Sequence, residues 1–492
     1  MAESIGQPDV LSKRLKFAYS VGHVLNDVTA AMWLSYFIVF YYRVVNFTNA
    51  IAGYFFLIGQ IADAVSTIFV SLASDRTRTG LFHYGKRKTW HLIGVICVFI
   101  SFPFCFNSCI GCQNSKFWIQ FTYYAVFITI FQFGWASSQV AHLAMINELT
   151  HIDGERVALN SYRYAWAFLS STSLYAMASF FLGFSFTGDE STITPADLPI
   201  FRKLTFIVIG FGLFFMIIFH VGLKESNQTI EEKKHHSKLI LTSNRKLKKM
   251  TWMSILCEKE FYQCAVVWTS ARIILNVTQA FLPLYTIDTI SKLNRVYVAI
   301  VPLCIYITSF IASFPMREIN KRLGRNLTNM IGYGLILACM ILFWFIIDIE
   351  SKLQIQIALI LACILFGIST STTSICSTAL ASDFIGLNTE CGAFVYGVMT
   401  FVDKLSNGII IALVQHFNPC KLDSTHACAL YYRYIIAFIP GCVAILAILM
   451  ILNMWKTNVG GNRFEIVQDE ESSTSTDMKD EVDSKEQNLL MA

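Results

Sequence analysis

Long apolar stretches alternate with short polar ones along most of the 492-residue chain. A helix needs about 20 apolar residues to cross the hydrocarbon core of a bilayer. Stretches of about that length recur twelve times, so the pattern predicts an all-α membrane protein with twelve transmembrane helices. We expect the spans at residues 17–42, 50–73, 90–107, 118–146, 158–183, 201–222, 261–285, 295–316, 328–348, 355–382, 390–415 and 431–454.

Lys and Arg indicate which ends of the spans face the cytosol. They gather before the first span and in the turns after even-numbered spans, above all in "SDRTRTGLFHYGKRKTW" and "MREINKRLGRN". Basic residues in short loops stay on the cytosolic side, so both termini are expected there. We expect these two turns to act as cytosolic gate loops, through Asp75, Arg76, Lys86, Arg87, Lys88, Lys321, Arg322 and Arg325.

The two sharpest basic turns lie six spans apart, and the longest polar loop lies midway between them. This six-plus-six layout is typical of transporters whose two halves enclose a central cavity. We therefore expect a cytosolic N-terminus at 1–16, a six-helix bundle at 17–222, a basic cytosolic linker at 223–260, a second six-helix bundle at 261–455 and a disordered acidic cytosolic tail at 456–492.

Composition narrows the function classes. Only 14% of the residues are charged, against about a quarter in soluble proteins. The net charge of +5 comes from turns that face lipid headgroups, so the expected partner is the bilayer and no nucleic acid. No HExxH, GxSxG or GxxxxGK[ST] motif occurs, so we expect neither an enzyme nor a resident metal or cofactor.

The last residues of the tail carry a short candidate targeting motif. The stretch "EQNLLMA" resembles an acidic-dileucine sorting signal at Glu486, Leu489 and Leu490. Such a signal would recruit sorting adaptors from the cytosol.

Ionisable residues inside the predicted spans are the main candidates for function. Each costs about 2.5–3.5 kcal/mol near a helix centre, so it must face protein or water. Helical spacing places these charges on polar stripes of several spans, which predicts a shared polar interior. The candidate substrate and coupling-ion cavity residues are Asn26, Asp27, Asp63, Thr67, Trp135, Gln139, His142, Arg163, Arg272, Asn276, Tyr396, Asp403 and Lys404.

Asp403 and Lys404 raise the question of partners most sharply, because they are adjacent in the eleventh span. Neighbouring residues on a helix point about 100° apart, so they cannot be each other's main partner. We expect Lys404 to meet either Asp63 or Asp27 across the cavity, and Asp403 to meet Arg272.

Three of these residues also have structural interpretations that the sequence leaves open. His142 fits a hydrogen-bonded packing residue as well as a ligand. Asp403 fits a structural counter-ion. Arg163 lies near the expected cytosolic interface and can extend its side chain toward it.

Five of the fourteen cysteines fall in or beside two loops on the non-cytosolic face: Cys105, Cys109, Cys112, Cys420 and Cys428. A CxxC pair is compatible with zinc or redox chemistry, but only one such pair occurs and no histidine set accompanies it. Disulfides are favoured, one joining Cys420 to Cys428 and one within the loop between the third and fourth spans.

Several of the same stretches resemble a known family. "GQIADAVST", "FQFGWASSQVAHL", "YRYAW" and "SDFIGLNTECGAFVYGVMTFVDKLSNG" look like the glycoside–pentoside–hexuronide:cation symporter branch of the major facilitator superfamily. "SFPFCFNSCIGC" and "FPMREINKRLGRN" are similar to its cysteine importers of lysosomes and melanosomes. The resemblance implies two six-helix bundles that import cysteine from the cytosol by alternating access, in a lysosomal or melanosomal membrane.

The resemblance carries over residue by residue only in part. The sugar symporters' carboxylates of the first and second spans, arginine of the fifth and lysine of the eleventh fall on Asp27, Asp63, Arg163 and Lys404. Two further carboxylates that hold sugar and cation fall on Thr67 and Gln139, which are neutral. H⁺ is therefore favoured over Na⁺ as the coupling ion.

The chemistry of the candidate residues agrees with a small zwitterion. Arg272 suits a carboxylate, Asp27 and Asp63 suit an ammonium group, and Trp135 suits a thiol. An alternative is a cation-coupled symporter of a sugar or lysolipid at the plasma membrane. A second alternative, of another class, is a membrane scaffold or sensor that does not transport.

Overall fold

The structure is a computed structural model that describes residues 11–77, 84–150, 153–184, 193–223, 252–290, 293–385, 392–420 and 425–455. Most of the central linker, the tail with its sorting motif, and the side chain of Asp75 lie outside the described residues.

Every regular element among the described residues is helical, as the sequence predicts. In the first half the elements are α1 (Lys13–Ser20), η1 (Val21–His23), α2 (Val24–Val39), η2 (Phe40–Val44), α3 (Asn49–Arg76), α4 (Lys86–Cys105), α5 (Phe117–Leu149), α6 (Asp153–Phe184), η4 (Pro195–Asp197) and α7 (Leu198–Gly222). In the second half they are α9 (Trp252–Cys257), α10 (Lys259–Leu284), η5 (Tyr285–Thr289), α11 (Tyr297–Ser313), α12 (Met316–Leu323), α13 (Arg325–Phe345), η6 (Ile346–Asp348), α14 (Lys352–Ile385), α15 (Gly392–His416) and α16 (Thr425–Asn453).

The long helices have the length and composition of membrane spans. Ten helical segments of the described chain are long and apolar enough to cross a bilayer. The shorter apolar helix α11 and the 33-residue helix α5 pack among them. The all-α membrane fold is thereby confirmed.

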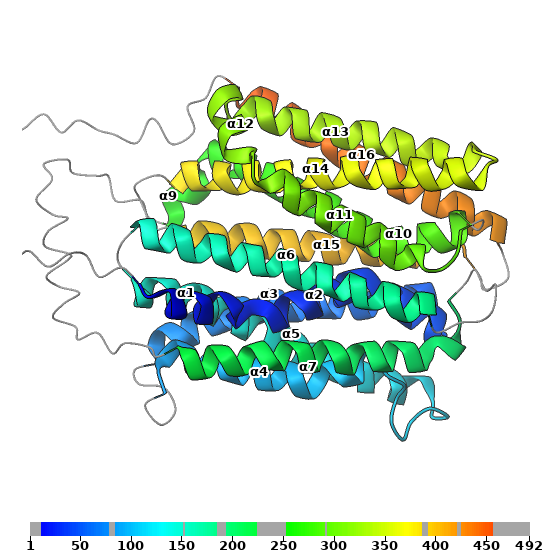
Figure 1. The fold of residues 1–492 in the computed structure, drawn as a ribbon, viewed down its shortest axis with the longest axis horizontal. Coiled ribbons are helices and arrows are strands. Elements are labelled where there is room, and N and C mark those ends of the chain that lie inside the picture. The colour runs from blue at the N-terminus through cyan, green and yellow to red at the C-terminus, as the bar shows by residue number, and fades with distance from the viewer. Residues whose placement is uncertain are drawn as a thin grey trace, which may run out of the picture.

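The helices run nearly parallel, and the two halves of the chain lie beside each other (Figure 1). Helices α3, α6 and α2 of the first half face α15, α11 and α10 of the second. We call the end that holds Lys86 and α12 the basic end. The opposite end, which holds residues 106–116 and 417–420, is called the disulfide end.

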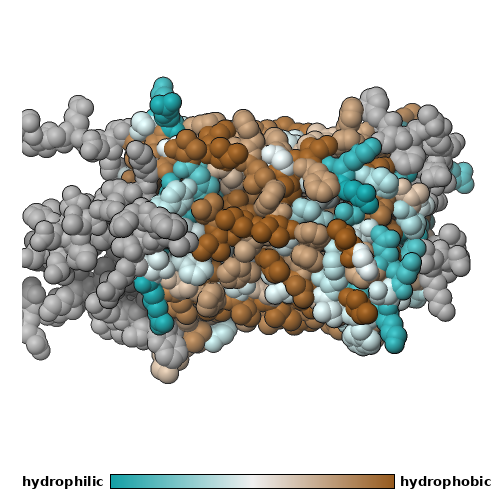
Figure 2. Space-filling view, turned by 90° about the horizontal axis from the view of Figure 1, so that it is seen from below, coloured by the Kyte–Doolittle hydropathy of each residue, from teal (hydrophilic) through white to brown (hydrophobic). Residues whose placement is uncertain are grey.

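A belt of apolar side chains covers the middle of the bundle, and hydrophilic residues gather toward the disulfide end (Figure 2). On the long helices, Phe214, Ile217, Ile341 and Ile357 are each more than half exposed. Exposed apolar side chains on long helices are favourable only against lipid, so this surface is the one that faces the bilayer.

Glycines allow one pair of helices in the first half to approach closely. A Cβ at Gly94 of α4 would lie 2.6 Å from the Gly134 carbonyl oxygen of α5, and a Cβ at Gly134 would lie 2.7 Å from that of Gly94. Small residues at helix crossings are a common means of packing in membranes, where backbone proximity replaces the hydrophobic effect.

Two buried ion pairs join the halves at the disulfide end. Arg295, just before α11, donates to Asp197 of η4 at 3.1 Å, and both side chains are nearly inaccessible to solvent. Arg43 of η2 pairs with Asp288 of η5. Neither pair was predicted from the sequence. Together they close the disulfide end in the observed conformation.

Both predicted disulfides are present at that end. Cys109 pairs with Cys112 in the loop after α4, and Cys420 pairs with Cys428. The inclusion of Cys105 among the disulfide candidates was wrong. It belongs to the last turn of α4 and is fully buried as a free thiol in the hydrophobic core.

The Asp197–Arg295 pair gives a first testable prediction. Asp197→Asn should destabilise the protein by about 3–5 kcal/mol, because it removes the negative charge that Asp197 places 3.1 Å from a buried guanidinium. Thermal unfolding of the purified protein in detergent measures this effect. The matched control is Asp348→Asn, whose carboxylate is 57% exposed in its pair with Arg433 and should matter by about 1 kcal/mol or less. Equal shifts in the two variants would contradict the prediction.

Candidate functional site

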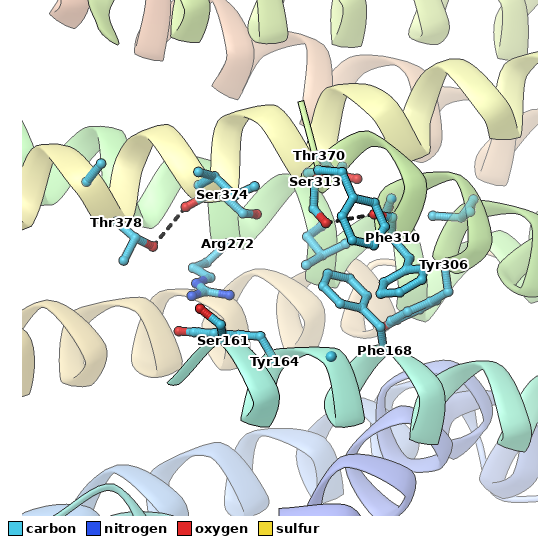
Figure 3. A pocket seen from close by; sticks show the side chains of 18 of the residues that line it. Ser161, Tyr164, Phe168, Arg272, Tyr306, Phe310, Ser313, Thr370, Ser374 and Thr378 are labelled. Atoms are coloured by element: carbon cyan, nitrogen blue, oxygen red, sulfur yellow. Dashed lines mark hydrogen bonds between the residues drawn. The ribbon is translucent and has the colours of Figure 1, made fainter. Parts of the chain in front are cut away.

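A cavity of about 790 Å³ lies between α6 of the first half and α10, α11, α14 and α15 of the second. Its position between the halves is where the six-plus-six layout predicts a substrate site. Figure 3 shows side chains from these elements converging on the cavity from both halves.

The cavity extends from the middle of the bundle toward the basic end. Tyr306 and Thr370 line it near the middle of α11 and α14. Ser161 lies near the start of α6, Ser382 lies in the last turn of α14, and Phe314 follows α11. All three of these positions are at the basic end, so the cavity reaches that end.

Arg272 is the only charged residue among the described residues that line the cavity. Its guanidinium lies 5.1 Å from the centre of the Trp268 ring, and no hydrogen bond to it is present within the described part of the chain. In Figure 3 the guanidinium points toward Ser161 and Tyr164 across the cavity. A guanidinium in this setting is available to a carboxylate or another anion.

Helix α14 supplies a wall of hydroxyl groups opposite α6. Thr370 and Thr378 donate to carbonyl groups of their own helix, at 2.8 Å in each case. An oxygen that has donated its proton in this way retains lone pairs that accept from a ligand. The hydroxyl side chains of α14 that line the cavity are Thr370, Ser371, Ser374, Thr378 and Ser382.

Sequence reasoning missed this wall, although the signal was visible. The tenth predicted span contains "GISTSTTSICSTALAS", an unusual density of hydroxyl residues. These hydroxyl residues are uncharged, whereas the predicted cavity was built around ionisable residues within the spans.

A buried hydrogen-bond network separates the cavity from the disulfide end. Gln279 of α10 donates to the Tyr175 hydroxyl at 2.8 Å and to the Ser35 hydroxyl at 3.2 Å. The Tyr306 hydroxyl donates to the Gln279 carbonyl oxygen at 3.3 Å, and Ser35 and Tyr175 lie 2.7 Å apart. Since Ser35 and Tyr175 belong to the first half, this network also ties the two halves together.

Lys404 meets Asp63, one of its two expected partners. The ammonium group donates to Asp63 Oδ1 at 2.7 Å and to the Thr67 hydroxyl at 3.0 Å. It also lies 5.2 Å from the centre of the Trp135 ring. Both charged side chains are more than nine-tenths buried, and the pair joins the middle of α3 to the middle of α15.

Arg272 acts on the charge of Asp403, as its candidate partner should, but the two side chains form no direct ion pair. Trp268 lies between them: its indole N–H donates to Asp403 at 3.3 Å, while Arg272 stacks on its ring. Asn407 also donates to Asp403, at 3.1 Å. Asp403 is therefore satisfied by neutral donors of its own half, and the guanidinium of Arg272 remains directed into the cavity.

Asp27 lies in the interior of the first half. It accepts from His23 at 2.8 Å, and the other ring nitrogen of His23 lies 3.3 Å from Arg163. Its second carboxylate oxygen is buried and has no partner among the described residues. Arg163 is 7% exposed, so its side chain stays in the protein interior and does not extend to the interface.

Asn26 and Trp135 connect α2 with α5. Asn26 donates to the Trp135 carbonyl at 2.9 Å, the Trp135 indole donates to the Asn26 carbonyl at 3.1 Å, and Ser138 donates to the Asn26 side chain. This reciprocal arrangement is a structural contact within the first half.

The remaining candidates are distributed as follows. His142 is fully buried and bonds to the Tyr19 carbonyl at 2.9 Å, which agrees with the packing interpretation. Tyr396 lines the cavity. Gln139 and Asn276 are half-buried, and the described residues provide no hydrogen bond to either side chain.

The basic turns make contacts within one half in this conformation. Lys88 donates to the carbonyls of His220 and Leu223 at 3.2 and 2.6 Å, which caps the end of α7, and Arg87 donates to Ser74. Arg325 pairs with Asp383, which ties α13 to α14. The exposed candidates of these turns are Arg76, Lys321 and Arg322.

Comparisons with known proteins assign a family to this fold and cavity. The family model described as "MFS/sugar transport protein" matches residues 18–460. The human "Major facilitator superfamily domain-containing protein 12" is 34% identical over 92% of this chain and 95% of that protein. The "Isoprimeverose transporter" of Lactiplantibacillus pentosus is 24% identical over 67% of this chain and 64% of that protein.

A solved structure agrees at the level of the fold. The crystal structure of a D-xylose-proton symporter superposes with a TM-score of 0.65 at 13% identity, over 90% of this chain and 97% of that one. The chain therefore belongs to the MFS/sugar transport protein family of the major facilitator superfamily, and it is a multi-pass secondary transporter related to Major facilitator superfamily domain-containing protein 12.

Proposed function

We propose that this transporter imports cysteine from the cytosol into lysosomes and lysosome-related organelles such as melanosomes, by alternating access. Family membership establishes the class of secondary transporter. The sequence resemblance to cysteine importers supports the finer assignment. The observation that carries it is Arg272, the one charged side chain that the described part of the chain contributes to a cavity between the two halves.

The cavity offers a complementary group for each part of a cysteine molecule. Arg272 would donate to the α-carboxylate. The hydroxyl oxygens of α14 would accept from the ammonium group. Phe168 and Phe310, whose ring centres are 5.6 Å apart, offer aromatic edges against which a thiol packs favourably.

The two ends of the bundle support the orientation in the membrane that import from the cytosol requires. The basic end, which the cavity reaches, is the cytosolic end under the distribution of Lys and Arg. The disulfide end would face the lumen, since disulfides persist on the non-cytosolic side of cellular membranes. The observed conformation is then open to the cytosol and ready to receive substrate.

Release into the lumen requires the contacts at the disulfide end to separate. These are the Asp197–Arg295 and Arg43–Asp288 pairs and the Gln279 network. In the course of the same movement, the basic turns of the two halves would approach each other and close the cytosolic end. Lys404 and Asp63 lie in the middle of the helices that rock against each other, so we assign them to the coupling of the halves.

One observation favours the alternative of a sugar substrate. The hydroxyl wall of α14 also suits a polyol, and the family includes a sugar transporter. In an uptake assay, replacing sodium with choline separates the two functions. Strong sodium dependence with sugar uptake would favour the alternative, whereas sodium-independent cysteine uptake supports our proposal.

The main test is uptake of labelled cysteine by lysosomes isolated from cells with and without this protein, at controlled lumenal pH. We expect uptake to depend on the protein. Equal uptake by both preparations would contradict the proposed substrate or location.

Arg272→Gln should raise the KM for cysteine about tenfold or more, because a hydrogen bond to a charged group contributes about 1.5–3 kcal/mol. Labelled cysteine uptake is competed with unlabelled cysteine and with cysteamine, which lacks the carboxylate. The comparison shows whether loss of a carboxylate contact causes the higher KM. Arg272→Gln should weaken competition by cysteine and leave competition by cysteamine unchanged. Arg433→Gln removes an arginine far from the cavity and serves as the control. An equal loss of competition by both compounds would refute the carboxylate contact.

Asp63→Asn and Lys404→Ala should each abolish most cysteine transport and destabilise the protein by about 3–5 kcal/mol, since each leaves one buried charge unpaired. The double variant Asp63→Asn/Lys404→Gln removes both charges. It should unfold at a higher temperature than Asp63→Asn alone and yet remain defective in transport. Wild-type transport rates in correctly localised single variants would show that the pair has no part in the cycle.

A further inference from the structure

The first span is interrupted at η1, and buried histidines gather around the break. Residues Val21–His23 form a 3₁₀ turn between α1 and α2. His91 of α4 and His142 of α5 are fully buried against this turn, and His23 is part of it. Figure 1 places α1, α2, α4, α5 and α7 together in the first half, on the side away from α13 and α16.

Backbone carbonyls of the interrupted span fix the protonation of two of these rings. His91 Nε2 lies 2.9 Å from the Gly22 carbonyl oxygen, and His142 Nε2 lies 2.9 Å from that of Tyr19. A carbonyl oxygen only accepts, so both Nε2 atoms carry a hydrogen. In a neutral ring, Nδ1 is then an acceptor.

Gly22 allows His142 and Phe219 to lie close to the turn. A Cβ at this position would lie 2.8 Å from His142 Nε2 and 2.3 Å from the Phe219 ring. Any larger residue would push the rings away from the backbone.

The remaining nitrogens of His91 form a chain to the basic end. His91 Nδ1 lies 3.1 Å from His220 Nε2, and His220 Nδ1 lies 2.8 Å from the Tyr84 hydroxyl. Since His91 Nδ1 accepts, His220 Nε2 donates and His220 Nδ1 accepts from Tyr84. All hydrogen bonds of this series therefore point the same way, with Tyr84 donating to His220, His220 to His91, and His91 to the Gly22 carbonyl. Both imidazoles are neutral.

His142 and His23 continue the series toward the middle of the bundle. The ring centres of His91 and His142 are 5.9 Å apart, and those of His142 and His23 are 5.5 Å apart. His142 Nδ1 is buried and has no partner among the described residues, so it is an unoccupied basic site. His23 donates to Asp27 and accepts from Arg163, and it is neutral as well.

We propose that these four histidines form the path and the binding site of the coupling proton, between Tyr84 at the basic end and the His23–Asp27 pair. This inference rests on the proposed transport cycle and adds the route of its coupling ion. Buried series of His and carboxylate groups act as proton relays in membrane pumps and transporters.

Each transfer along the path conserves the number of protons. A proton that binds His220 Nδ1 releases the Nε2 proton to His91 Nδ1. After rotation of the rings, His91 passes a proton to His142 Nδ1, and His142 passes one to His23. The path ends there because Asp27 is the only carboxylate, among the described residues, that faces the cluster.

The charges around the cluster define where the proton rests. Arg163 of α6 faces His23 and His142, and Lys88 of α4 faces His91 and His220. Both cations oppose a charged imidazole, and Tyr19 and Tyr84 are neutral. Asp27 offsets the repulsion at His23 alone, so the His23–Asp27 pair is the stable resting place.

Protonation of His23 would affect the cavity through Arg163 and Tyr164. A charged imidazole donates from both nitrogens, so His23 would no longer accept from Arg163. The guanidinium of Arg163 lies 5.5 Å from the centre of the Tyr164 ring, and Tyr164 lines the cavity. Gain or loss of the proton would therefore move Arg163 and change the cavity wall.

The test uses the purified full-length protein in liposomes that contain a pH-sensitive dye. Two assays are compared: net cysteine uptake under an imposed pH gradient, and exchange of labelled for unlabelled cysteine at equal pH, which needs no net proton movement. His142→Gln keeps a donor for the Tyr19 carbonyl and His23→Asn keeps one for Asp27, but neither residue titrates. The matched control is His416→Gln, whose histidine bonds Tyr54 at the disulfide end.

We expect the wild type and His416→Gln to couple uptake to the gradient and to move protons. His142→Gln and His23→Asn should lose both effects and retain cysteine exchange. Gradient-driven uptake that persists in these two variants would overturn the proposal, as would parallel loss of uptake and exchange in variants whose unfolding temperature is unchanged. A wild-type protein that exchanges cysteine, but whose net cysteine uptake is insensitive to the pH gradient, would overturn the proton path alone. Absence of wild-type cysteine exchange would instead overturn the proposed function.

Discussion

The cost of placing a charge away from water governs this structure. Lys404 and Asp63 are both almost fully buried in the middle of the bundle, and they meet at 2.7 Å across the boundary between the two halves. Neither charge is stable there alone, because breaking a buried pair leaves an uncompensated ion that costs several kcal/mol. The pair thus constrains the position of α15 against α3, and with it the packing of one half on the other.

The need to pair buried charges also accounts for the difference between the two ends of the bundle in the observed conformation. From the middle of the bundle to the disulfide end, the halves are joined by the Lys404 pair, the Gln279 network and two buried ion pairs. Toward the basic end, Lys88 bonds to the Leu223 carbonyl and Arg325 pairs with Asp383, each within its own half. The cavity forms on this less connected side, and Arg272 is the charge that remains directed into it.

The first half contains a second group of ionisable residues that is separate from the cavity. There, carbonyls of an interrupted helix, neutral histidines, Arg163 and Asp27 satisfy one another almost completely. The exceptions among the described residues are His142 Nδ1, Asp27 Oδ2 and Arg163 Nε, which are all buried and unpartnered. Two of these vacant atoms, a ring nitrogen and a carboxylate oxygen, are acceptors at which a proton can bind.

The sequence by itself determined the all-α membrane fold, the cysteines of the two disulfides and the helix faces that carry polar residues. Each of these depends on local properties: the length of an apolar run, the period of a helix, and the spacing of cysteines along a loop. It also narrowed the partner of Lys404 to two carboxylates. Only the tertiary structure decided between Asp63 and Asp27, placed Trp268 between Arg272 and Asp403, and paired Asp197 with Arg295. Periodicity fixes which face of a helix is polar, but the rotation and axial position of packed helices decide which groups meet. Those are set by contacts between residues far apart in the chain.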